Sequence, residues 1–270
     1  MPASALAIRD NRPSRRLDFT AVTRRAGWPS GADMVGPTLQ IVGEELCEAL
    51  DVAAGNGNAA LAAARRWCDV TATDPVRALL ACAHERAVTD RLDIDFREAD
   101  ADALPFADGS FDVVMSTFGV MFTPDQERAA AELVRVCRRG GKIGLANWTP
   151  EGFIGRVLEA IGKHMPPPAG EKSPCLWGTR ARIAELFKPH ASSITSEQRS
   201  FTFRYRSPEH WLTAFKIHYR PLLAAFAALD AAARAELERD LMRLISQLNY
   251  SGNGSMVVAS EYLEIVITRR

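Results

Sequence analysis

The feature that most constrains this chain is an apolar run that ends in two glycines and leads straight into an alanine-rich stretch. Residues 50–54 are apolar apart from Asp51, Gly55 and Gly57 follow, and residues 59–66 have high helix propensity. Glycine permits positive φ and carries no Cβ, so a ligand can approach the backbone closely, and the start of the next helix favours a bound anion. The pattern predicts a strand, a tight turn and a helix with a ligand over the turn.

A carboxylate closes the next apolar segment. Asp74 follows residues 70–73, and Pro75 comes after it, where the first turn of a helix tolerates a missing N–H. A carboxylate at such a strand end can accept both hydrogen bonds of a ribose diol. The two segments predict a nucleoside-binding α/β unit, but residues 55–60 also satisfy the loose G-x-G-x-x-G/A dinucleotide pattern, so the kind of nucleotide stays open.

Three downstream segments decide between these possibilities. They are residues 99–106 (ADADALPF), residues 110–116 (SFDVVMS) and residues 138–142 (RRGGK). With the glycine turn and Asp74 before them, they resemble the class I S-adenosylmethionine (SAM)-dependent methyltransferases. The resemblance is strongest to the branch of the ubiquinone and menaquinone biosynthesis C-methyltransferases. A lone glycine motif is weak evidence, whereas five pieces in the family's order are strong.

The resemblance implies a doubly wound, mostly parallel seven-stranded α/β sheet of the Rossmann-like type. Its last strand is expected to be antiparallel and at the sheet edge, and helical insertions are expected to form a lid. We expect residues 1–17 to be a flexible arm and residues 18–270 to be a single methyltransferase domain. In that domain the cofactor-binding core spans about 38–148, and the substrate-lid insertions span about 149–180 and 207–250.

Periodicity and turn residues predict the individual elements. A Gly-Gly pair at 140–141 is expected to end the fourth of the helices. The expected helices are 37–48, 59–66, 75–87, 127–137 and 179–187, with a mostly helical stretch over 207–247, and further strands are expected at 94–100, 142–148, 201–205 and 256–268.

The resemblance also implies a SAM site, with S-adenosylhomocysteine as the product. Asp51 belongs to the first motif, Asp74 is the ribose-binding acid, and Asp100 serves the adenine, with Asp102 as a competitor shifted by two residues. The bland alternative is an ordinary βα turn in which Asp74 caps a helix and Asp51 caps nearby amides. The expected cofactor-binding residues are Asp51, Ala53, Gly55, Gly57, Asp74, Pro75, Asp100, Ala101, Ser116 and Phe118.

The residues that bind the acceptor are less defined. No general base can be assigned, and His218, Tyr219 and His164 are the candidates, although a histidine on an apolar face is more often a core residue. Helical spacing puts His218 on one face with Trp211, Phe215 and Leu222. For the aromatic candidates, core packing is the alternative to a pocket. The candidate pocket residues are Met121, Phe122, Trp148, Phe153, Trp177, Trp211 and Phe215.

Composition excludes several partner classes. The 33 basic residues balance 33 acidic ones, and residues 116–119 (STFG) lack the [Asp/Asn/Ser]-Pro-Pro-aromatic motif of amino-directed nucleic-acid methyltransferases, so no nucleic-acid partner is expected. No apolar stretch suits a membrane span or a signal peptide, and the 5 scattered cysteines lack zinc-site spacing. We expect a cytoplasmic protein without a metal or a membrane partner; its oligomeric state cannot be read from the sequence.

The function favoured by the sequence is methyl transfer from SAM to a small, apolar or aromatic metabolite at oxygen, carbon, nitrogen or sulfur. An NAD(P)-dependent oxidoreductase or epimerase is one alternative, although no tyrosine is followed by lysine four residues later. A non-catalytic cofactor-binding module is the other alternative.

Overall fold

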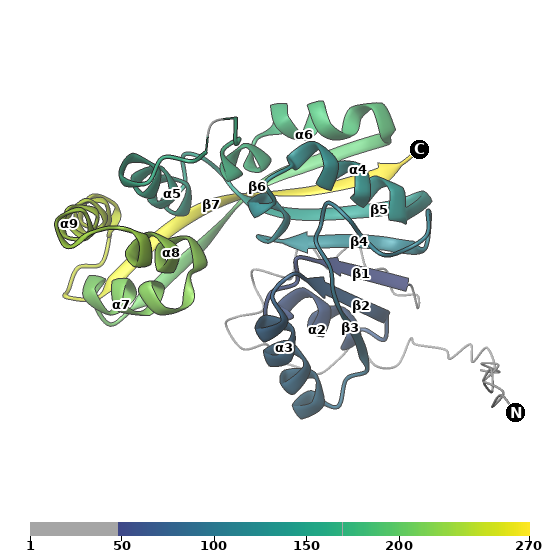
Figure 1. Cartoon of the computed structure of the whole chain (residues 1–270), viewed down its shortest axis with the longest axis horizontal. Helices are drawn as coiled ribbons and strands as arrows, with labels where there is room; N and C mark the ends of the chain where they lie inside the picture. The colour runs from purple at the N-terminus through teal and green to yellow at the C-terminus, as the bar shows by residue number, and fades with distance from the viewer. Residues whose placement is uncertain (1–47, 169) are drawn as a thin grey trace, which may run out of the picture. The chain divides into compact units, whose positions relative to one another are not determined.

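The computed structural model describes residues 48–168 and 170–270, and in them a seven-stranded sheet has helices on both faces (Figure 1). The strand order is β3-β2-β1-β4-β5-β7-β6. β7 is antiparallel to both of its neighbours, and the other paired strands are parallel. The strands are β1 (Glu48–Val52), β2 (Asp69–Asp74), β3 (Ile94–Glu98), β4 (Phe111–Thr117), β5 (Cys137–Trp148), β6 (Ala191–Tyr205) and β7 (Met256–Arg269).

Helices bury the two faces of the central strands against separate apolar clusters. On one face, Val113 and Met115 of β4 pack with the alanines of α2 (Asn58–Ala64). On the other face, Val114 packs with α4 (Gln126–Val136), which begins where Asp125 accepts the N–H of Arg128. Strands covered on both sides in this way read as continuous apolar runs. The doubly wound sheet that the sequence predicts is confirmed.

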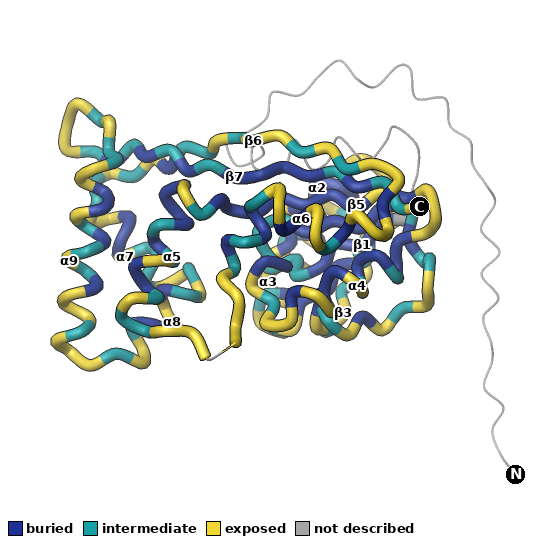
Figure 2. Tube along the Cα trace, turned by 90° about the horizontal axis from the view of Figure 1, so that it is seen from above, coloured by how far each residue is buried: buried dark blue, intermediate teal, exposed yellow. Residues whose placement is uncertain are grey.

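The position of the last strand differs from the expectation. β7 is antiparallel as predicted, but β6 is the edge strand, and β7 lies between β5 and β6. Figure 2 shows β7 largely buried beside a more exposed β6. The cause is composition, because β6 is rich in serine, threonine and charged residues, which suit an edge, whereas Leu263, Ile265 and Ile267 of β7 need burial.

A ladder of β6 and β7 continues past the end of β5. β5 pairs with β7 only as far as Trp148 and Tyr262, whereas β6 and β7 pair on to Tyr205 and Met256. Four helices that pack on one another lie beside this extension and form a helical cap (Figure 1). They are α5 (Phe153–His164), α7 (Pro208–His218), α8 (Arg220–Ala228) and α9 (Ala231–Leu248).

Two predicted boundaries are wrong for identifiable reasons. α4 ends at Val136, and the predicted stop at Gly140 and Gly141 lies inside β5. A Cβ on Gly141 would lie 2.7 Å from the carbonyl oxygen of Asp112, so glycine there allows β4 and β5 to approach closely. The helical stretch over 207–247 is three helices, because Tyr219 and Asp230 are extended and cap the next helix.

The remaining elements follow their predictions closely. α3 (Arg77–Asp90) starts two residues after Pro75, and α6 (Arg180–Phe187) starts after Thr179, whose hydroxyl accepts the N–H of Arg182. Glu48 begins β1 rather than ending a helix, and the rest of the helix predicted at 37–48, like the arm at 1–17, lies outside the described residues. None of the helices in 48–168 or 170–270 has both the length and the apolar character for a membrane span.

Candidate cofactor and acceptor site

Asp51 is a buried carboxylate at the end of β1, with an exposed fraction of 1%. Its Oδ2 accepts the N–H of Ala60 in α2 at 2.8 Å, while Oδ1 has no hydrogen-bond partner. Burial raises the pKa of Asp51 from 3.8 to about 7; the bond from Ala60 opposes this rise and the charge of Asp74 adds to it. A buried oxygen without a donor is costly, so Asp51 offers an acceptor to a positively charged ligand group.

The two glycines of the turn after β1 have different roles. Both have positive φ, +57° at Gly55 and +83° at Gly57. A Cβ on Gly57 would lie 2.8 Å from the Cβ of Ala83, so this glycine lets α2 pack against α3. A Cβ on Gly55 would have no atom within 4 Å. Of the two glycines, only Gly55 faces space that a ligand can use.

Asp74 holds the same turn from the end of β2. One of its carboxylate oxygens accepts the N–H of Gly55 at 3.0 Å, and the other accepts the N–H of Val76 at 2.8 Å. The structural alternative raised by the sequence is therefore partly realised, because Asp74 caps backbone amides. Each carboxylate oxygen still has a second lone pair for a ribose hydroxyl. Pro75, the next residue, is exposed.

The loop after β3 carries the residues expected beside the adenine. Asp100 is exposed and its carbonyl oxygen accepts the N–H of Ala103, whereas Ala101 is buried. The carbonyl oxygen of Asp102 accepts a bond from the Arg128 guanidinium at 2.8 Å. Ala99 ties the loop to β2 through a bond from its N–H to the carbonyl oxygen of Asp74 at 3.4 Å. The loop therefore starts beside the putative ribose acid, as an adenine-binding segment must.

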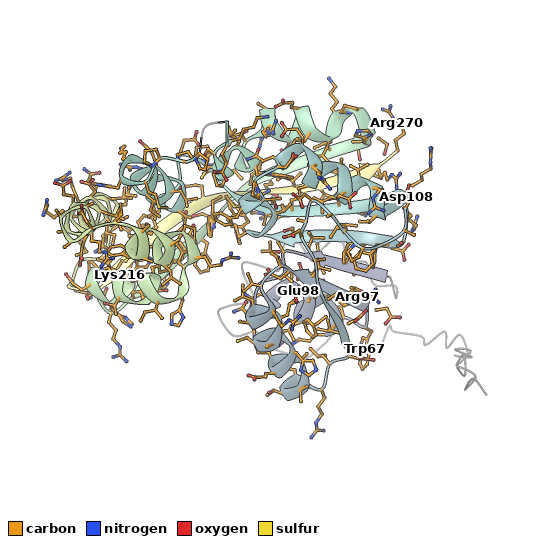
Figure 3. The ribbon with its side chains drawn as sticks, in the orientation of Figure 1. Trp67, Arg97, Glu98, Asp108, Lys216 and Arg270 are labelled. Carbon is orange, nitrogen blue, oxygen red and sulfur yellow. The ribbon has the colours of Figure 1, made fainter. Side chains whose placement is uncertain are left out.

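An arginine that the sequence analysis did not single out fixes this loop. The guanidinium of Arg135 in α4 donates to the carbonyl oxygens of Leu104 and Phe106 at 2.9 and 2.6 Å. It also pairs with Glu132, whose carboxylate accepts the N–H of Leu104 at 2.8 Å. Arg97, labelled in Figure 3, lies 5.3 Å from the centre of the Phe106 ring. The i, i+3 spacing of Glu132 and Arg135 was the available signal.

Replacing Arg135 by methionine should loosen the loop. The change keeps most of the apolar stem but removes charge-assisted bonds, so we expect the free energy of unfolding to fall by about 2 to 3 kcal/mol. Urea denaturation measures this change, and the exposed Arg139→Met is the matched control. An Arg135→Met protein as stable as the control would show that the loop does not depend on this side chain.

The turn after β4 touches the turn after β1. Phe118 has a φ of +57°, and its N–H donates to the carbonyl oxygen of Ala146 at 2.8 Å. A Cβ on Gly119 would lie 2.2 Å from the carbonyl oxygen of Ala53, so only glycine fits there. The hydroxyl of Ser116 accepts the N–H of Val120 at 3.0 Å and thus supports the turn. The residues expected around the cofactor therefore gather where β1, β2 and β4 end.

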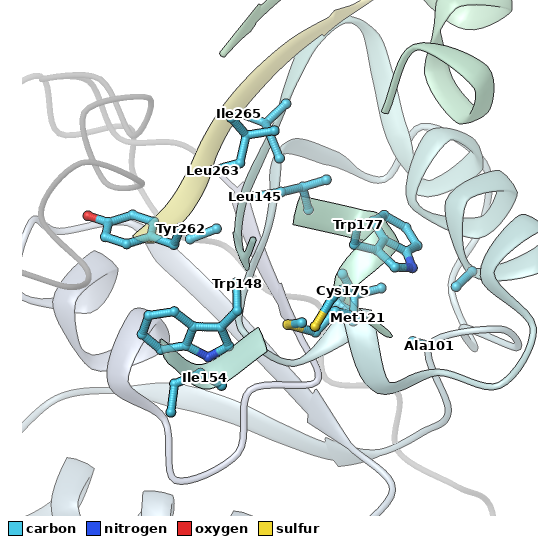
Figure 4. Packing of buried hydrophobic residues seen from close by; sticks show 14 of the residues in the cluster. Ala101, Met121, Leu145, Trp148, Ile154, Cys175, Trp177, Tyr262, Leu263 and Ile265 are labelled. Atoms are coloured by element: carbon cyan, nitrogen blue, oxygen red, sulfur yellow. The ribbon is translucent and has the colours of Figure 1, made fainter. Parts of the chain in front are cut away.

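The aromatic candidates pack into one cluster beyond β5. The Phe118 ring stacks on Trp148 with centroids 4.0 Å apart, and Figure 4 shows Met121 between Trp148 and Trp177. Phe153 lies 5.1 Å from Trp211 between ring centroids. Five of the seven candidates are buried in this cluster, Phe215 packs against it, and Phe122 is exposed: the buried five are Met121, Trp148, Phe153, Trp177 and Trp211. This arrangement fits the core-packing alternative for most of them.

Known proteins share both the sequence and this fold. A family model described as a methyltransferase domain matches residues 50–145. The demethylmenaquinone methyltransferase of Thermus thermophilus is 31% identical over 180 residues, which are 64% of this chain and 82% of that protein. The chain belongs to the SAM-dependent methyltransferases. An uncharacterised protein of Mycobacterium tuberculosis is 41% identical over 91% of this chain and 89% of its own length. The YcgJ protein of Bacillus subtilis has the same fold, with a TM-score of 0.59, 17% identity, and coverage of 88% of this chain and 99% of its own.

The candidate bases of this methyltransferase are dispersed. His164 lies 2.9 Å from Asp240 between α5 and α9, at the end of α5 remote from β5. His218 is exposed at the last position of α7, and Leu222 belongs to α8, so the predicted shared face is interrupted. The Tyr219 hydroxyl is buried without a partner, and burial raises its pKa above its ordinary value, so it keeps its proton and can act only as a donor or acceptor.

Asn147 is the polar residue of β5 that the sequence analysis missed. Its side chain is 0% exposed, and neither its Nδ2 nor its Oδ1 has a partner. It precedes Trp148 at the end of the strand, where ligands bind in open α/β sheets. A single asparagine in the otherwise apolar segment 143–148 was the signal in the sequence.

Proposed function

We propose that this methyltransferase transfers the methyl group of SAM to a small apolar or aromatic metabolite. The observation that carries the cofactor assignment is the open face of Gly55 together with the unpartnered buried oxygen of Asp51 and the carboxylate of Asp74. These groups fit the cofactor, because a carboxylate in a poorly solvated site attracts positive charge and a second one can accept ribose hydroxyls. SAM, when bound, supplies a methyl group on a positively charged sulfur.

Each residue of the chain then has a task. Asp51 holds positive charge, Asp74 accepts the ribose diol, and Asp100 is placed for the exocyclic amine of adenine. Phe118, stacked on Trp148, excludes water at the end of β4. With no base in evidence among the three candidates, the rate enhancement rests on holding the methyl group and the nucleophile in line.

The helical cap and the segment that follows β5 form the acceptor half of the proposed site. These parts correspond to the insertions expected at about 149–180 and 207–250. Both begin where β5 or β6 ends, and they carry most of the aromatic cluster. An apolar lining selects apolar or aromatic acceptors, because burial of such surface drives their binding.

The raised pKa of Asp51 predicts a pH dependence of folding. Between pH 3.8 and about 7 the folded protein binds more protons at Asp51 than the unfolded chain, so this group lowers stability as the pH rises. The loss is on the order of 4 kcal/mol in all. Asp51→Asn keeps an acceptor for Ala60 and removes the charge, so thermal melts should show it more stable than the parent near pH 8, with the gain shrinking near pH 4.5. A difference independent of pH would contradict the burial of a titrating Asp51.

The function is tested by incubating the protein with methyl-labelled SAM and a fractionated extract of small metabolites, and by following the label with mass spectrometry. We expect label in one or a few small apolar or aromatic products. Gly55→Val, which should not bind SAM, is the matched control. Label found only in nucleic acid or protein, or no label above the control, would contradict the proposal.

A further inference from the structure

Two buried polar side chains near the end of β5 have no partner in the folded protein. Asn147 leaves both of its amide atoms unpaired, and Tyr219 leaves its hydroxyl unpaired. More than nine in ten buried polar groups in proteins are hydrogen-bonded, so such exceptions need a cause. A group that loses its hydrogen bonds to water costs stability unless a ligand restores them.

The two residues come from different elements that meet at the short helix η3 (Pro174–Gly178). A Cβ on Gly178 would lie 2.0 Å from the carbonyl oxygen of Trp148, so η3 lies directly on the end of β5 that carries Asn147. Cys175 of η3 is close enough to Tyr219 to raise the pKa of its hydroxyl further, after burial itself. Figure 4 shows Cys175 beside Met121, in the cluster against which Tyr219 packs.

Tyr219 connects this place to the helical cap. It caps the end of α7 and the start of α8, and its ring lies 5.2 Å from Phe215 and 6.4 Å from Phe122 between centroids. Phe122 ends the turn after β4, where the cofactor-binding residues gather. The tyrosine therefore stands between the expected cofactor end of the sheet and the cap that is expected to choose the acceptor.

The polar groups at this place are neutral. They are an amide and a phenol, with the Cys175 thiol beside them, whose pKa burial raises to about 11. Arg182 of α6 is a buried cation, but it is paired with Glu127 and Glu185. A charged ligand group would be buried there without a counter-charge, which is far more costly than burying a neutral one. The amide N–H groups and the phenol O–H can all donate to an oxygen.

We propose that the Asn147 amide and the Tyr219 hydroxyl recognise a neutral aromatic acceptor through an oxygen that it carries. This inference rests on the methyl-transfer function proposed above and names its substrate class. Neither residue is assigned a proton-transfer role. Both are specificity-determining groups whose unpaired state in the folded protein is the cost of binding that oxygen.

A stability gain coupled to a loss of recognition would distinguish this role from simple packing. Asn147→Leu and Tyr219→Phe each remove an unpaired polar group with little change in volume, so both should raise the melting temperature by a few degrees. A structural polar residue would behave in the opposite way. Tyr250→Phe, at a tyrosine that is 61% exposed, is the matched control and should change neither stability nor recognition.

The binding test uses three probes of one shape on protein saturated with S-adenosylhomocysteine. They are 1-naphthol, naphthalene and 1-naphthoate, and calorimetry or tryptophan fluorescence reports their dissociation constants. We expect naphthol to bind at least tenfold more tightly than naphthalene or naphthoate. Asn147→Leu and Tyr219→Phe should each reduce the preference for naphthol over naphthalene to about threefold or less, while Tyr250→Phe keeps it.

Three results would overturn the inference. One is a preference for naphthoate, a second is equal or absent binding of all three probes, and a third is a naphthol preference that survives both substitutions. These outcomes are separable from failure of the proposed function, because saturation with S-adenosylhomocysteine is measured first. A protein that does not bind S-adenosylhomocysteine would fail the proposed function before any probe is added.

Discussion

Gly55→Val is expected to abolish cofactor binding. The Cβ position of Gly55 faces open space beside Asp51 and Asp74, and its φ of +57° disfavours a β-branched side chain. The valine methyl groups would occupy the space assigned to SAM, so thermal melts of the variant should lose the stabilisation that S-adenosylhomocysteine gives the parent protein. A retained shift of several degrees would show that the glycine turn is only structural.

Backbone strain at Gly55 needs its own control. Gly170 also has positive φ, +90°, and a Cβ there would meet no atom within 4 Å. Gly170→Val therefore introduces comparable strain away from β1, β2 and β4. This control should lose some stability but keep the full ligand-induced shift. If both variants lost the shift equally, strain rather than exclusion of the cofactor would be the cause.

Asp74→Ala is expected to weaken cofactor binding by about 1.5 to 3 kcal/mol, the usual range for hydrogen bonds to a charged group. This corresponds to roughly a ten- to hundredfold rise in the dissociation constant of SAM. The variant should also lose stability, because the N–H groups of Gly55 and Val76 lose their acceptors. Calorimetric titration measures the binding, and urea denaturation measures the folding.

Asp74→Asn separates the two effects of the alanine variant. The amide oxygen keeps one acceptor for the backbone, so folding should suffer less, while only one oxygen remains for the ribose. Cofactor affinity should therefore fall by more than stability would suggest. An Asp74→Ala protein that folds less well but binds SAM as tightly as the parent would leave Asp74 as a helix cap and nothing more.

The central sheet was predictable because its signals are local. Glycines, a strand-end carboxylate and alternating apolar runs lie close together in the sequence, and they predicted β1, β2 and the turns beside them. The lateral place of β7 was not predictable in the same way, because strand order depends on pairing between β6 and β7 across more than fifty residues of helical cap. That pairing leaves no local pattern.

The acceptor half was harder for a related reason. Helical spacing placed His218 on the apolar face, but the helix stops there, and the following residue, Tyr219, turns its ring toward Phe215. Single-sequence periodicity assumes that a helix continues. It also cannot show that a buried polar side chain lacks a partner, so Asn147 became visible only when the strands and η3 were assembled.

The most direct test of the account is a calorimetric titration of the full chain with S-adenosylhomocysteine and, separately, with NAD. The account predicts saturable binding of S-adenosylhomocysteine that Gly55→Val abolishes, and no binding of NAD. The sheet supports this expectation, because the all-parallel dinucleotide-binding order lacks an antiparallel strand such as β7. Tight binding of NAD, or S-adenosylhomocysteine affinity unchanged in Gly55→Val, would contradict the assignment of the turn between β1 and α2 as a SAM site.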